Sequence, residues 1–144
     1  MSEQLTTYFD ALVRHETELW NAVDRRMTGG ALRMGRLQVL RVIAAAERGA
    51  RVQDIADGVG TTIGAASRLV ERLLGDGLVD RVPDPVDRRS VRVTLTEAGG
   101  TALADSLARF EAVLAEALAG VDPEALREGI SAIERTQAAL EVAR

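Results

Sequence analysis

The residues of this sequence best suited to chemistry are arginine and hydroxyl side chains that gather in two short stretches. A helix expected over residues 62–74, the turn before it and a loop at 83–89 carry the candidates Thr61, Thr62, Ser67, Arg68, Arg72, Arg88 and Arg89. Arginine presents a planar fork of donors that matches phosphate oxygens and the guanine edge, and hydroxyl groups donate to phosphate. These side chains therefore predict contact with duplex DNA rather than bond-making chemistry.

The expected helix at 62–74 has apolar residues at helical spacing, which should face the body of the protein. Its other side is then left to Thr62, Gly64, Ser67, Arg68, Glu71 and Arg72. Arg68 fits a bidentate contact to guanine, worth about 1–3 kcal/mol of discrimination, and it fits a phosphate contact equally well. The less favoured alternative is a surface ion pair with Glu71. Arg72 suits phosphate or an acidic neighbour. Either Thr61 or Thr62 also suits the position that caps the helix.

The loop at 83–89 contains two prolines and ends in Asp87, Arg88 and Arg89. The Asp87 carboxylate is placed to hold one guanidinium in a bidentate pair and so to aim the other arginine outward. The alternative is that both arginines only solvate an exposed turn.

Residues 52–95, which surround these candidates, change periodicity twice. A short apolar helix pattern from Val52 ends at Gly58-Val59-Gly60, and a second helix pattern ends at Gly75-Asp76-Gly77. Residues 78–82 and 90–95 then alternate apolar and polar, as half-buried strands do. Two helices joined by a turn and followed by a hairpin predict a winged helix-turn-helix.

Three stretches of the sequence resemble the MarR (multiple antibiotic resistance regulator) family. They read DIADGVG, SRLVERLLGDGLVDRV and DPVDRRSVRVTLTEAG, and the most specific is the run from Asp87 to Gly99. The resemblance implies a homodimeric transcriptional regulator, often a repressor that a small molecule releases from DNA. It also implies that Arg89 is the wing-tip arginine that enters the minor groove, while Arg88 supports the loop or a phosphate.

The same resemblance implies an effector of the small aromatic or phenolic class. In this family aromatic acids often bind between the dimerisation helices and the winged part, where this chain has Tyr8, Arg14, His15, Trp20 and Met34. No spacing among these five residues identifies a pocket. The alternative for His15 is a solvated or core-edge side chain on a long helix.

Length and periodicity predict the remaining architecture. The chain of 144 residues should form a single domain that is mainly α with a small β-hairpin wing. We expect 32–95 to be the winged part and 1–30 and 96–144 to be dimerisation helices. The expected helices span 5–27 and 32–47, then run from Thr96 to a stop at Gly120 and onward from Asp122-Pro123. A monomeric helical bundle is the alternative to the dimer.

The sequence lacks the residues that several classes of protein require. The chain has no cysteine, one histidine and none of the common nucleophile, zinc-protease or phosphate-loop motifs, so we expect no enzyme, no cofactor and no metal site. It has no apolar run of the roughly 18 residues that suggest a membrane span, and no signal peptide opens it. We therefore expect a cytoplasmic protein.

Net charge divides the chain into unequal parts. The total is −4, but residues 31–95 carry +3, whereas residues 1–30 carry −2 and residues 96–144 carry −5. The positive balance falls on the part expected to face DNA. A second interpretation stays open, because net acidity also suits a winged helix that docks a protein partner and never binds DNA.

Overall fold

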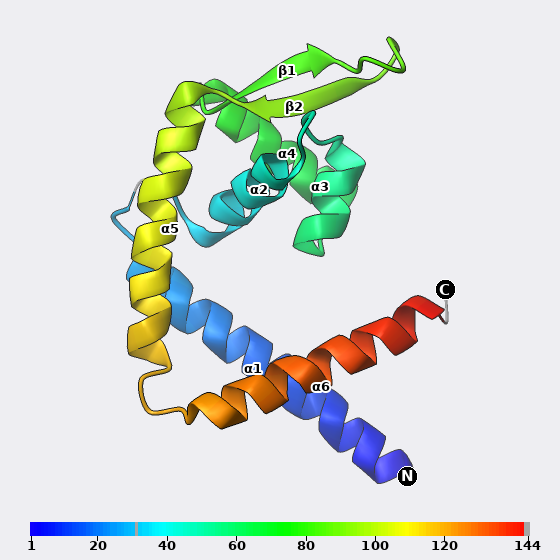
Figure 1. Cartoon of the computed structure of the whole chain (residues 1–144), viewed down its shortest axis with the longest axis vertical. Helices are drawn as coiled ribbons and strands as arrows, with labels where there is room; N and C mark the ends of the chain where they lie inside the picture. The colour runs from blue at the N-terminus through cyan, green and yellow to red at the C-terminus, as the bar shows by residue number, and fades with distance from the viewer. Residues whose placement is uncertain (31, 143–144) are drawn as a thin grey trace.

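The computed structural model describes residues 1–30 and 32–142, and its elements follow the predicted order (Figure 1). In chain order they are α1 (Ser2–Met27), α2 (Met34–Ala45), α3 (Val52–Val59), α4 (Ile63–Gly75), β1 (Val79–Pro83), β2 (Val91–Leu95), α5 (Glu97–Ala117) and α6 (Pro123–Val142). The mainly helical winged helix-turn-helix is thus confirmed. Residues 143 and 144, which belong to the predicted dimerisation segment, lie outside the described residues.

Two helices are shorter than the sequence predicted. Helix α2 ends at Ala45 rather than Glu47, because the N–H of Ala46 turns back to the carbonyl of Ile43 at 3.2 Å and tightens the last turn. Helix α5 ends at Ala117, before Gly120, since the N–H of Val121 bonds to the carbonyl of Leu118 at 2.9 Å in a closing turn. In both cases a tight turn stops the helix before the expected residue.

The turn between α3 and α4 is built by one glycine and one threonine. Gly60 adopts a left-handed backbone with φ of 74°, which lets the N–H of Thr61 reach the carbonyl of Ala56 at 2.9 Å and close α3. Thr62 then begins α4, because its hydroxyl accepts the N–H of Ala65 at 3.2 Å. The cap that the sequence left open between two threonines is therefore Thr62.

The core lies between the helices of the winged part and the base of the hairpin. Helix α2 runs through the middle, and its buried side chains pack with those of α3, α4 and the strands, namely Leu37, Leu40, Ile43, Ile55, Val70, Leu73, Val79 and Val93. The strands pair antiparallel from Val79 opposite Leu95 to Pro83 opposite Val91. Ala50 also bridges to Val93, which ties the start of α3 to the wing.

Helix α5 links the wing to the far end of the molecule, where α1 and α6 cross (Figure 1). Its first turn is anchored by Thr96, whose hydroxyl donates to the carbonyl of Gly77 at 2.7 Å and accepts the N–H of Gly99 at 3.0 Å. Further along, Arg109 donates to the carbonyls of Arg26 and Thr28, at 2.8 and 3.2 Å. These contacts fix α5 to the hairpin at one end and to α1 at the other.

No helix of the described chain is long and apolar enough to span a bilayer.

Gly99 is the tightest contact between α5 and the hairpin, because a Cβ added there would overlap the backbone carbonyl of Leu78. Replacing Gly99 with alanine should lower the free energy of unfolding by about 1–3 kcal/mol, the usual cost of overpacking. Gly100→Ala is the matched control, since nothing lies within 4 Å of the added carbon, and alanine there should stabilise the helix by up to about 1 kcal/mol. Urea unfolding of both variants measures the difference, and equal effects would contradict the assigned contact.

Candidate nucleic-acid interface

The solvent side of α4 carries the residues that the sequence assigned to it. Thr62, Gly64, Arg68, Glu71 and Arg72 are exposed. Ser67, also assigned there, is half-buried, and Ala66, Val70 and Leu73 are buried on the other side. Apart from Ile63, which is 51% exposed at the start of the helix, this side of α4 is polar, and Gly64 and the short side chains allow close approach to a ligand.

Glu71 joins this helix to the wing, because its carboxylate pairs with the guanidinium of Arg81 on β1. The expected alternative of a pair between Glu71 and Arg68 is therefore not what forms. Within residues 1–30 and 32–142, neither Arg68 nor Arg72 has a carboxylate within ion-pair distance. Both guanidinium groups are available to an external anion beside the hairpin.

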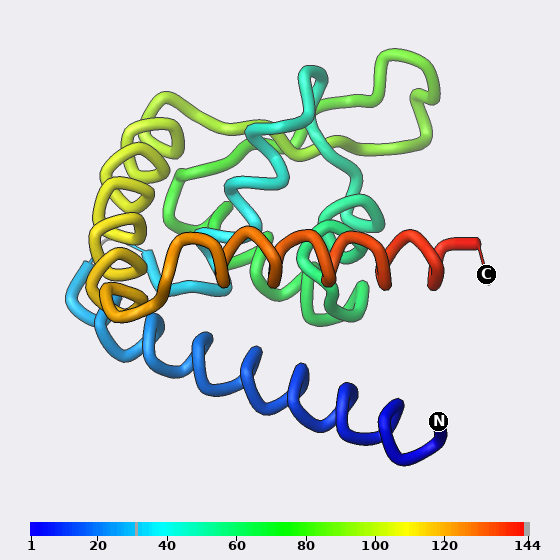
Figure 2. The backbone as a smooth tube through the Cα atoms, turned by 60° about the horizontal axis from the view of Figure 1, so that its bottom comes forward, coloured from blue at the N-terminus to red at the C-terminus, as the bar shows by residue number. Residues whose placement is uncertain are grey.

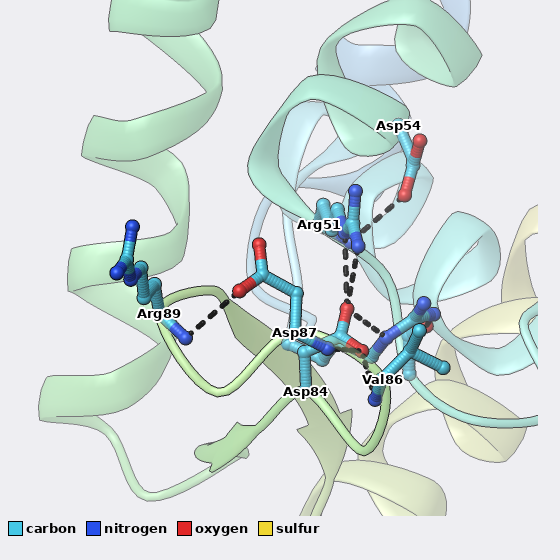
Figure 3. A network of polar contacts seen from close by, with 8 residues as sticks. Arg51, Asp54, Asp84, Val86, Asp87 and Arg89 are labelled. Carbon is cyan, nitrogen blue, oxygen red and sulfur yellow. Dashed lines mark hydrogen bonds and ion pairs between the residues drawn. The ribbon is translucent and has the colours of Figure 1, made fainter.

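The wing loop is organised around the carboxylate of Asp84, which is 1% exposed (Figure 3). One oxygen accepts the backbone N–H groups of Val86 and Asp87, at 2.9 and 3.3 Å. The other accepts Arg51 at 2.8 and 3.1 Å and Arg92 at 2.8 Å. A single buried carboxylate thus joins the loop to the start of α3 and to β2.

This arrangement corrects the predicted role of Asp87. Its carboxylate was expected to hold an arginine guanidinium, but Asp87 Oδ1 instead accepts the backbone N–H of Arg89 at 3.0 Å (Figure 3). The reason is local geometry: an aspartate reaches the amide two residues ahead more readily than a side chain leaving the loop. Asp87 shapes the tip of the wing, and the buried arginine pairs belong to Asp84.

Arg51 and Arg92 were missed by the sequence interpretation. Arg51 precedes α3 and also offers its backbone N–H to Asp54 at 3.0 Å, while Arg92 donates to the carbonyl of Gly49 at 3.1 Å. Arg92 lies opposite Val82 in the hairpin, and Val82 is two residues before Asp84 in the chain. Strand register was the only available signal, and it could have placed Arg92 near Asp84 but not Arg51.

Arg51 and Arg92 are bound to Asp84, and the tip of the wing exposes Val86, Arg88 and Arg89. Val86 is 82% exposed and was not among the predicted contacts. Two arginines on a braced hairpin, next to a polar helix face, form a surface suited to a DNA backbone and its grooves.

Comparisons with known proteins agree with this geometry. Residues 32–91 match the profile of the MarR family. The winged part of the chain is a MarR family domain. A comparison with curated protein sequences gave no significant match.

Solved structures resemble the chain over most of its length. The transcriptional regulator PA3341 is 29% identical with a TM-score of 0.78, covering 93% of this chain and 98% of its own. CouR from Rhodococcus jostii RHA1, bound to p-coumaroyl-CoA, is 25% identical with a TM-score of 0.76, covering 86% of this chain and 87% of its own. A MarR family transcriptional regulator from Silicibacter pomeroyi is 21% identical with a TM-score of 0.82, covering 96% of each chain.

The candidate effector residues do not form one pocket around the MarR domain. Trp20 and Met34 line a shared hollow between α1, α2 and α5. Arg14 faces a separate depression on α1, and the hydroxyl of Tyr8 lies 2.9 Å from that of Thr136 on α6. His15 is exposed and lines none of these hollows. The predicted set of five therefore reduces to two residues in contact with one site.

The hydrogen bonds in the wing of this MarR domain lower the pKa of Asp84. The backbone N–H of Val86 contributes most, followed by the guanidinium of Arg51, and together with the other donors they outweigh the opposing effect of burial. The same pair raises the pKa of Arg51, chiefly through its hydrogen bond to Asp84. Asp84 is therefore ionised throughout the neutral range.

Asp84→Asn should lower the melting temperature at neutral pH, because Arg51 and Arg92 then lose their charged acceptor. A depressed pKa in the folded state stabilises the fold at pH values above the ordinary aspartate pKa of about 3.9, and this stabilisation is lost as pH falls further. The difference between the two proteins should shrink steadily below about pH 4. Thermal unfolding across this range measures it, with Asp87→Asn as the exposed control. A difference that stays constant with pH would exclude the ionised Asp84 as its source.

Proposed function

We propose that the chain is a sequence-specific DNA-binding transcriptional regulator that acts as a homodimeric, ligand-responsive repressor. The observation that carries this proposal is the braced wing, in which Asp84 is buried and Arg88 and Arg89 are exposed beside the polar side of α4. Proteins of the MarR family are transcription regulators, which supports the same class of function. We propose a cytoplasmic location for this regulator.

The contacts follow from the residue types. Helix α4 enters the major groove with Arg68 on a base edge or a phosphate, while Thr61, Thr62, Ser67 and Arg72 bind the backbone. Arg89 enters the minor groove, where A·T-rich DNA concentrates negative potential, and Arg88 supports it at a phosphate. CouR, a related repressor, has been solved on a 23-mer DNA duplex.

A homodimer is supported by apolar surface that the single chain leaves open. Helix α6 buries no side chain of its own, and its face exposes Leu126, Ile130, Ile133 and Leu140. Leu5 and Phe9 at the start of α1 are 65% and 64% exposed, and α1 and α6 extend toward the same side of the molecule (Figure 2). We assign 1–30 and 96–144 to dimerisation and 32–95 to DNA binding, within one domain.

Two copies related by a two-fold axis would place two α4 helices in successive major grooves. The operator is then pseudo-palindromic, with half-sites about one helical turn, roughly 10 bp, apart. The acidic charge of the terminal segments lies away from the DNA in this arrangement.

The second candidate is a winged helix that docks a protein partner and does not bind DNA. The observation that favours it is the net charge of −4. Retention on random duplex DNA at low salt, with loss of binding as salt rises, separates the two, because counterion release makes DNA binding strongly salt-dependent.

Replacing Arg89 and replacing Arg68 should change DNA binding in different ways. Arg89→Ala should weaken binding to all sequences, most where the flank is A·T-rich, because it removes charge from the region of strongest potential. Arg68→Ala should cost about 1–3 kcal/mol at one position of each half-site if it contacts a base. If Arg68 contacts phosphate, the variant should lose the same affinity for every DNA sequence. The magnitude of the slope of log K against log salt concentration should then decrease by about one per site.

Titrations on an operator, a flank-swapped operator and random DNA at several salt concentrations measure these effects. Arg135→Ala removes an exposed arginine from α6 and serves as the control. Wild-type affinity of Arg89→Ala on all three DNAs would remove the wing from the mechanism and favour the protein-docking candidate.

The apolar face of α6 gives a separate test of the dimer. Ile130→Glu should convert the protein to a monomer, because the charge enters a surface that must lose its water on association. Ser131→Glu adds the same charge near Arg127 and Arg135 and should leave the dimer intact. Sedimentation equilibrium of both variants measures the state, and a dimer that survives Ile130→Glu would place the interface elsewhere.

A further inference from the structure

Two adjoining hollows beside α1 share Glu16 and Trp20. The first, about 360 Å³, lies between α1, Gly35 of α2, the turn at Val59–Thr61 and Leu69 of α4. The second, about 270 Å³, lies between α1, α2 and α5 and includes Met34 and Phe110. Their combined size is in the range of sites that bind small organic molecules.

Among the described residues, Glu16 is the only ionised side chain that lines either hollow, and the other lining residues are apolar or neutral. Its neighbours three and four residues away along α1 are Leu12, Val13, Leu19 and Trp20, so no cation on the helix offsets the charge. In the part of the chain that the structure describes, the Glu16 carboxylate accepts one hydrogen bond, a long contact of 3.5 Å from the Thr17 hydroxyl. Within the described residues no arginine lies within ion-pair distance of Glu16.

The nearest aromatic groups also favour positive charge. Trp20 is 37% exposed, and the face of an indole ring attracts cations more strongly than any other side chain's. Phe110, in the second hollow, already holds the guanidinium of Arg41 at 5.7 Å from its ring centre. That arginine also donates to Gln38, another residue of the second hollow, at 3.1 Å, but Arg41 itself does not line the hollow and does not pair with Glu16.

We propose that the site between Glu16 and Trp20 binds an organic cation that carries an aromatic or apolar group. The carboxylate of Glu16 holds the positive charge, Trp20 covers it, and Met34 and Leu114 contact the apolar part. The aromatic acid suggested by the family resemblance fits less well, because Arg14 and His15, the residues that would hold it, lie outside both hollows.

The site also reaches the DNA-binding part of the chain. Gly60 and Thr61 line the first hollow and immediately precede Thr62, the cap of α4, and Leu69 lies on α4 itself. A bound cation therefore contacts α1 and the start of α4 at once, and biases the angle between them. This regulatory meaning rests on the proposed function, whereas the preference for a cation does not.

Trp20 is the single tryptophan of the chain, so its fluorescence reports binding directly. The full-length protein is titrated with benzyltrimethylammonium, benzyl alcohol and phenylacetate at constant ionic strength, which compares a cation, a neutral molecule and an anion on the same ring. The cation should bind up to about fivefold more tightly than phenylacetate, as expected for one exposed charge pair.

Glu16→Gln keeps the shape of the side chain and should raise the Kd of benzyltrimethylammonium about fivefold while leaving that of benzyl alcohol unchanged. Glu18→Gln makes the same charge change at an exposed residue that lines neither hollow, and should leave both constants unchanged. Equal or tighter binding of phenylacetate, no response of Trp20 to the cation, or a Glu16→Gln protein with the wild-type constant would each overturn the proposal.

DNA retention by the same preparation keeps the two proposals apart. A protein that binds the cation through Glu16 but does not retain DNA would disprove the proposed function and leave the cation site standing. A protein that retains DNA but shows no preference for the cation would disprove the site alone.

Discussion

The burial of one carboxylate determines how the DNA-facing surface is held. Asp84 cannot lose its water without replacing every hydrogen bond that water made, and the replacements come from its own loop, from β2 and from the residue before α3. Because those donors belong to three segments, the loop cannot move without leaving a buried charge unpaired. The exposed arginines at the tip therefore project from a fixed base, although no carboxylate of the described residues pairs with their guanidinium groups.

The parts of the fold that were predictable from the sequence are those held by local interactions. Helix α1, the helix-turn-helix and the cap at Thr96 follow from periodicity and short-range hydrogen bonds, which a sequence displays openly. Even the uncertainty between Thr61 and Thr62 was a matter of one residue. The two strands of the hairpin follow in the same way, from alternation of apolar and polar residues, whereas their register is known only from the structure.

The site was less predictable because its key contacts join distant residues. Arg51 lies 33 residues before Asp84, and no local pattern marks the pair. Asp87 was assigned a role that its neighbour in the loop performs, since two aspartates three residues apart look alike until one is buried. The candidate effector residues do not line a common hollow within one chain, because Tyr8 and Trp20 are 12 positions apart on one helix, a distance of about 18 Å.

Helix α6 contributes no buried side chain to a single chain, and its described contact with α1 is the hydroxyl pair of Tyr8 and Thr136. In the proposed homodimer, association would bury its apolar face, and association follows mass action. The fraction of chains with an ordered α6 then depends on how much protein a cell contains. At low abundance the protein would be silent not for lack of a ligand but for lack of a second copy. A regulator of the proposed kind would respond to its own concentration before it binds any DNA sequence.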